Sequence, residues 1–178
     1  MYANHFLRNK PNSMIWKASK YHLEDMSLSE LVVSYFQYPA IQAYLLLAIA
    51  GVSYLSFYQL WSPILFMAGV LVAIVYPLIW YLLHRFLLHG SYLYKSPQFA
   101  KVWKRIHYDH HQDPNDLRVL FGALHTTLPT VALFSVPIGW VMAGLPGAIA
   151  AMSAGVLVTM FYESVSYTHL TLPTNREV

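Results

Sequence analysis

Two long uncharged blocks dominate the pattern of polar and apolar positions along the chain. No Asp, Glu, Lys or Arg occurs in residues 31–84, and none occurs in residues 119–162. Because a transmembrane helix needs about 20 predominantly apolar residues, each block is long enough to cross a bilayer twice. All charged side chains lie outside the blocks, in residues 1–30, in residues 85–118 and from Glu163 onward. The pattern predicts an all-α integral membrane protein with about four transmembrane or re-entrant helices.

Capping and turn residues divide the first block into elements. Ser27 and Glu30 form the S-x-x-E pattern of a capping box, which predicts a short helix that stops near Pro39. We expect residues 1–39 to form an interfacial N-terminal segment. The two transmembrane segments expected next are residues 40–60 and residues 64 to about 83, with a kink at Pro77 and a helical continuation through His84 and His89 to Gly90.

Glycine and proline divide the second block into residues 128–143 and residues 147–162. Each segment has about 16 residues, which is short for a full span. The pattern is therefore compatible with two tilted short helices and with a re-entrant hairpin. Between the blocks, Ser96 followed by Pro97 has the pattern of an N-cap and first helical residue. It predicts a helix over roughly residues 97–112. The expected membrane domain covers residues 40–164.

Composition and charge narrow the class of protein. Hydrophobic residues make up 57% of the chain and charged residues 11%, whereas a soluble domain carries about 25% charged residues. The absence of cysteine excludes disulfides and thiolate metal sites. Residues 85–118 hold six basic against three acidic side chains, which by the positive-inside tendency predicts that this helical segment faces the cytosol. A net charge of +3 gives no reason to expect a nucleic-acid partner.

Five of the nine histidines gather in two clusters next to the ends of the uncharged blocks. The stretch HRFLLH contains His84 and His89, and the stretch HYDHH contains His107, His110 and His111. On a helix, positions i, i+3 and i+4 share one face, so the second cluster can direct three nitrogens at one volume. Neutral imidazole is a good ligand for iron, zinc, copper and nickel. The five histidines are therefore candidate metal ligands.

The first cluster has a less favourable spacing. At 100° per residue, His84 and His89 would point about 140° apart on a regular helix and would not bind one ion together. Either the helix breaks there or the two histidines serve different ions, and the second option indicates a dinuclear centre. Other side chains are candidates for weaker roles. Acidic side chains could either accept hydrogen bonds from ring N–H groups or be solvated charges: Asp109, Asp113 and Asp116. His125 could be a ligand but fits a hydrogen-bonding interface residue better. Four aromatic residues suit an interface belt: Tyr81, Tyr92, Tyr94 and Trp103.

The two histidine stretches, in this order and membrane setting, resemble the membrane fatty acid hydroxylase/sterol desaturase superfamily over about residues 64–163. The resemblance implies a cytosol-facing centre of two iron ions on a helical membrane scaffold, with the five clustered histidines as ligands. It implies O2 as co-substrate, a cytochrome b5-like or ferredoxin-like external electron donor, and hydroxylation or desaturation of a lipid, most simply a fatty acyl chain. Glu163 resembles the acidic residue that opens the family's third histidine segment, so it is a candidate to support the ligands.

The end of the chain departs from this family. Members carry further histidines ending in another H-x2-H-H, whereas this chain has only His169 after Glu163. Residues 165–178 resemble the translation of a transposase sequencing adapter. We therefore expect a non-native tail after Ser164 and a truncated fragment, inactive as given, because five histidines are too few for a two-iron site built only from imidazole.

Other functions remain open. A sterol or carotenoid hydroxylase or desaturase belongs to the same superfamily, and a non-catalytic metal-binding or haem-binding membrane protein belongs to another class. Haem ligation would need histidines facing each other inside the spans, whereas these histidines lie at the span ends. A metal transporter would need ligands at mid-membrane depth, where residues 40–60 and 64–83 have no carboxylate or histidine. A zinc protease is disfavoured because H-E-x-x-H is absent.

Overall fold

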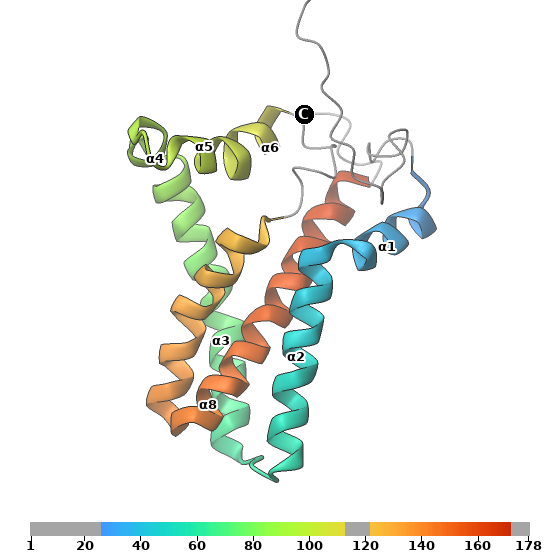
Figure 1. Ribbon diagram of the computed structural model, residues 1–178, viewed down its shortest axis with the longest axis vertical. Coiled ribbons are helices and arrows are strands. Elements are labelled where there is room, and N and C mark those ends of the chain that lie inside the picture. Colours follow the sequence, from blue (N-terminus) through green and yellow to red (C-terminus); the bar gives the residue numbers. More distant parts are fainter. Residues whose placement is uncertain (1–25, 113–121, 172–178) are drawn as a thin grey trace, which may run out of the picture.

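The computed structural model describes residues 26–112 and 122–171, and within these ranges every regular element is a helix (Figure 1). Three of the helices are long and apolar enough to cross a membrane, so the protein is an all-α membrane protein, as the sequence predicted. The elements are α1 (Leu28–Gln37), α2 (Pro39–Phe57), α3 (Pro63–Leu82), the π-helix η2 (Leu83–Leu88), α4 (Ser91–Lys95), α5 (Ala100–Trp103), the π-helix η3 (Lys104–Tyr108), α6 (Asp109–Gln112) and α8 (Leu124–Thr171).

Helix α8 is a hairpin rather than one straight rod. Its backbone leaves the helical region at Ala143 and Gly144, and Gly144 has φ +59°, a left-handed conformation that glycine adopts without steric cost. The two arms run back along each other beside α2 and α3 (Figure 1). Near the turn they pack closely, since a Cβ atom at Gly139 would collide with the Gly147 carbonyl. Four helical passes therefore form the bundle, and the predicted turn is confirmed.

Both arms of the hairpin are longer than the sequence pattern predicted. The first arm begins at Leu124, four residues before the expected start, and the second continues past residue 162. Polar side chains are tolerated at this start of the helix because threonine hydroxyls bond to preceding backbone oxygens. Thr126 Oγ1 donates to Ala123 O at 2.8 Å, and Thr130 Oγ1 donates to Thr126 O at 2.9 Å. The predicted length of about 16 residues for each arm is therefore too short.

The core lies between the passes and is small for the size of the chain. Fully buried side chains include Tyr44 on α2, Val72 on α3, and Val131 and Val156 on the two arms of α8. The outward faces of the same helices are apolar and exposed; Phe66, for example, is 69% exposed. A helix that is apolar all round is typical of a membrane span, where lipid covers the outer face.

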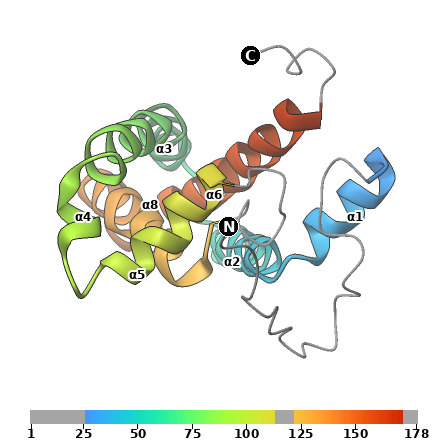
Figure 2. The ribbon, with the colours of Figure 1, turned by 90° about the horizontal axis from the view of Figure 1, so that it is seen from above.

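The other helices meet at the end of the bundle opposite the α2–α3 turn. Helix α1 begins with the predicted capping box, in which the Glu30 N–H donates to Ser27 Oγ and the Ser27 N–H donates to Glu30 Oε2. Helices α4, α5 and α6 run across the same end of the bundle, as the view along the bundle shows (Figure 2). The helix expected over residues 97–112 begins later, at Ala100, because Ser96 closes α4 and residues 97–99 form a turn.

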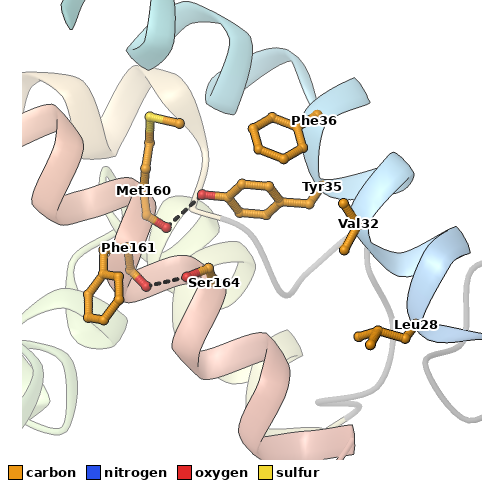
Figure 3. Close-up of a pocket in the computed structure, with 7 residues that line it drawn as sticks. All are labelled: Leu28, Val32, Tyr35, Phe36, Met160, Phe161 and Ser164. Carbon is orange, nitrogen blue, oxygen red and sulfur yellow. Dashed lines mark hydrogen bonds between the residues drawn. The ribbon is translucent and has the colours of Figure 1, made fainter.

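Tyr35 fixes α1 to the bundle. Its hydroxyl donates a buried hydrogen bond of 2.6 Å to the backbone oxygen of Met160 on α8 (Figure 3). Burial, and secondarily the negative charge of Glu163, raises the pKa of the Tyr35 phenol to about 12. The phenol therefore keeps its proton, and the bond persists, through the physiological pH range.

We expect Tyr35→Phe to lower the free energy of unfolding by about 1 kcal/mol, the net contribution of a typical hydrogen bond. Thermal unfolding of the detergent-solubilised protein measures this change. Tyr58→Phe is the matched control, because Tyr58 is 57% exposed. Equal losses in both variants would contradict the assigned role of the bond.

A hollow of about 330 Å³ lies between α1 and the end of the second α8 arm (Figure 3). The side chains around it are mostly apolar, and none of the clustered histidines takes part. Its lining residues are Leu28, Val32, Tyr35, Phe36, Met160, Phe161 and Ser164. The hollow is therefore separate from the candidate metal centre.

Candidate metal centre

Two π-helical segments carry clustered histidines. His84 lies in η2, His89 directly follows it, and His107 lies in η3. Segment η2 extends α3 beyond Leu82, and the His89 N–H donates to the His84 oxygen at 3.2 Å, five residues back. In η3 the Asp109 N–H likewise reaches the Lys104 oxygen. A π-helix has i→i+5 hydrogen bonds, so residues five apart lie about one turn apart. Of the two alternatives that the spacing of His84 and His89 left open, the structure shows the first, because the helix departs from regular α-helical geometry there.

The π-helical turns bring four histidines together. The Nε2 atoms of His84 and His89 are 3.2 Å apart. The ring centroids of His89 and His107 are 4.4 Å apart, and those of His107 and His111 are 4.6 Å apart. One ligand nitrogen from each of the four residues can be chosen such that all lie within 4.8 Å of one another. Both sequence clusters therefore contribute to one group, which we call the histidine group (His84, His89, His107 and His111).

The histidine group is buried on one side and open on the other. His107 is 4% exposed, His84 is partly buried, and His89 and His111 are exposed. His110 lies on α6 beside them, and its side chain falls outside the part of the chain that is described. A ligand bound here would be fixed from within the protein and accessible from outside it.

The spacing of the nitrogens fits a metal ion. Metal–imidazole bonds are about 2.0–2.1 Å long, so two ligands of one ion are at most about 4.2 Å apart. The His84–His89 separation of 3.2 Å lies within this limit, and the widest spacing of 4.8 Å exceeds it only slightly. Four neutral imidazoles are a donor set suited to a divalent transition metal. Rotations of the exposed rings would complete the coordination.

The residues predicted to support the ligands differ in their burial and in their contacts. Asp109 forms an ion pair with Lys104, one of the residues of η3. His125 is exposed on the first turn of α8 and is not in the histidine group. Glu163 is 8% exposed on the second arm of α8, also outside the group, and its Oε1 lies against Gly122. Asp113 and Asp116 lie outside the described residues.

Packing around η3 involves residues that the sequence did not single out for chemistry. Burial raises the pKa of the Tyr38 phenol, and Arg105 opposes this rise through its charge and a hydrogen bond, which places η3 near the start of α2. Trp103 donates from Nε1 to the Leu88 oxygen at 2.7 Å. Its ring is also 5.7 Å from that of His107, a pair four residues apart in the sequence. Only this spacing, typical of side chains on one helical face, could have indicated the contact.

An apolar hollow of about 430 Å³ adjoins the segment that carries His84 and His89. It lies where the end of α3 and η2 face Phe134 on the first arm of α8. Its lining residues are Ile79, Leu82, Leu83, Phe86, Leu87, Tyr92 and Phe134. Leu83, which lines the hollow, directly precedes His84 in the sequence, and no histidine of the group is among the lining residues.

A helical membrane bundle with imidazoles gathered at one end defines a class of integral membrane proteins with a candidate metal centre. Comparison with protein families narrows this class, because the model of the fatty acid hydroxylase family matches residues 69–177, more than half of the chain. The chain belongs to this family, as the sequence resemblance implied. No curated protein and no solved structure matches the chain. The match includes residues 165–177, and the non-native origin of this tail stays a prediction. The start of the membrane domain at residue 40 also stays a prediction.

Proposed function

We propose that this protein is an iron-containing, O2-dependent oxidoreductase of the membrane that hydroxylates a lipid acyl chain. Membership of the fatty acid hydroxylase family supports the class of reaction. The observation that carries the proposal is the histidine group, in which four imidazoles from two separate segments lie close enough to share an ion. Protein side chains do not oxidise unactivated C–H bonds, so the reaction needs such an ion.

Iron, when bound, supplies the redox chemistry with O2, and His84, His89, His107 and His111 are the residues that would hold it. The histidine group by itself matches the ligands of one ion. The family resemblance implies two ions, and the second would need ligands from outside the group. His110 on the adjoining α6 is the candidate in this chain. The role of the remaining chain is to hold the imidazole rings in place.

The proposed substrate is an acyl chain because the hollow beside η2 is lined mostly by apolar side chains at the end of α3, one of the helices apolar enough to cross a membrane. A hydrocarbon chain in this hollow would approach the histidine group from the bilayer side. Desaturation, and a sterol or carotenoid substrate, are the alternatives within the family. The mass change of the product separates desaturation from hydroxylation, and the size of the accepted lipid separates the substrates.

The proposed electron donor is an acidic soluble protein, cytochrome b5-like or ferredoxin-like. His89 and His111 are exposed, and the basic side chains of Arg85, Lys101 and Lys104 lie on the same segments. Complementary charge speeds encounter between such partners. By the positive-inside tendency, we propose that this end of the bundle faces the cytoplasm.

Lipid analysis of a host that expresses the gene tests the proposal. Because residues 165–178 resemble an adapter, the gene is first amplified from source DNA and resequenced. Mass spectrometry of extracted fatty acids should show a new species heavier by one oxygen atom, formed only with O2 and absent when His107 is replaced by alanine. A new species lighter by two hydrogens would indicate a desaturase. Metal binding without any new lipid would indicate the non-catalytic alternative.

A further inference from the structure

Trp103 joins the two histidine segments through two separate contacts. Its indole N–H donates a hydrogen bond of 2.7 Å to the backbone oxygen of Leu88, the residue before His89. Its ring packs beside the His107 ring, with centroids 5.7 Å apart and planes at 52°. His89 and His107 are also the closest pair of rings in the histidine group, at 4.4 Å. One rigid side chain therefore contacts the His107 ring and the backbone of the residue that precedes His89.

The hydrogen bond to Leu88 satisfies an acceptor that the helix itself cannot satisfy. Leu88 is the last residue of η2, and the final carbonyls of a helix have no N–H partner within it. Leu88 is 8% exposed, and buried carbonyl groups are nearly always hydrogen-bonded. Trp103 supplies the donor from 15 residues further along the chain. The end of η2 is thereby tied to the start of η3.

A further ring extends this contact. Tyr94 on α4 lies between the two segments in the chain, and its ring is 5.4 Å from the Trp103 ring at 49°. The Trp103 ring is thus close to three other rings, those of Tyr94, His107 and Tyr108. An indole has few rotatable bonds, so packing against several neighbouring rings restricts its direction and that of its N–H group.

We propose that Trp103 is a positioning residue, which sets the distance between the His84–His89 pair and the His107–His111 pair before a metal binds. Trp103 supplies no ligand atom. The expected effect on metal affinity rests on the proposed function, whereas the effect on the spacing of the two segments does not. Partners that orient metal ligands typically change metal affinity 10-fold to 100-fold when they are removed.

Trp103→Phe tests the role because it keeps an aromatic ring and removes the N–H donor. Trp61→Phe is the matched control, since Trp61 Nε1 also donates a hydrogen bond, to Ser56 Oγ at 3.0 Å, but at the α2–α3 turn. Titration of the metal-free proteins with Co2+, followed by its visible absorption, should show about 10-fold to 100-fold weaker binding for Trp103→Phe. Trp61→Phe should bind like the wild type. Equal Co2+ affinity in Trp103→Phe and wild type overturns the proposal.

A second measurement needs no metal. The chain has no cysteine, so cysteines introduced at the exposed positions Phe86 and Lys101 can be spin-labelled selectively. Electron-spin distance measurements should give a narrow distribution in the otherwise unchanged protein and in Trp61→Phe, and a broader one in Trp103→Phe. An unchanged distribution in Trp103→Phe overturns the proposal whatever the Co2+ result. If the wild type takes up no Co2+, the proposed function fails, and the label distances still decide the role of Trp103.

Discussion

Replacement of His107 by alanine is expected to abolish metal retention and, with it, any oxidation of lipid. His107 is the buried member of the histidine group, and its ring lies 4.4, 4.6 and 5.1 Å from those of His89, His111 and His84. Its removal leaves exposed or partly buried imidazoles without a fixed ligand between them. Metal content after gel filtration in detergent measures the effect.

His125→Ala is the control for this variant. His125 is exposed on α8 and lies outside the histidine group, so its replacement should leave the metal content unchanged. Wild-type metal content in His107→Ala would show that the histidine group is not the binding site. An equal loss in both variants would point to unfolding instead, which circular dichroism of the same samples identifies.

Gly139→Ala is expected to destabilise the α8 hairpin by about 1–3 kcal/mol, the cost of overpacking a close contact. A Cβ atom at residue 139 would collide with the backbone oxygen of Gly147 and with the Ala151 side chain. A backbone oxygen in a helix cannot rotate away, so the two arms must separate. The midpoint of thermal or denaturant unfolding in detergent measures the change.

Gly69→Ala provides the matched control on α3. There the new Cβ atom would meet only the Ala154 Cβ, at an ordinary contact distance of 3.6 Å. Alanine also favours a helix over glycine by about 1 kcal/mol, so this variant should be as stable as wild type or more stable. If Gly139→Ala unfolds no earlier than Gly69→Ala, the close approach of the arms near the turn is wrong.

Much of the fold follows from the spacing of charges and caps in the sequence. The absence of charge over residues 31–84 predicts α2 and α3, because a buried span tolerates few charges. Ser27 and Glu30 predict the start of α1. The sequence pattern predicts too late a beginning for α8 because His125, Thr126 and Thr127 are polar, whereas a hydroxyl group such as that of Thr126 bonds to a preceding backbone oxygen.

The histidine group shows where sequence patterns reach their limit. The cluster His107–His111 suggests a shared face on any helix, but the grouping of His84 with His89 depends on a π-helical turn. Periodicity arguments assume 3.6 residues per turn and cannot anticipate that change. For Trp103, likewise, the sequence predicts only a place in an interface belt. Its partner, the Leu88 oxygen, is a backbone atom that no residue pattern marks.

The most direct test of the central claim is the iron content of the purified wild-type protein, expressed in iron-supplemented medium and measured by mass spectrometry of the metal. The account predicts at least about one iron per chain, retained through gel filtration, as expected for a preorganised ligand set. The same measurement on a His84→Ala/His107→Ala double variant should give almost none. Wild-type protein without stoichiometric iron, or a double variant that retains it, would contradict the assignment of the histidine group as a metal centre.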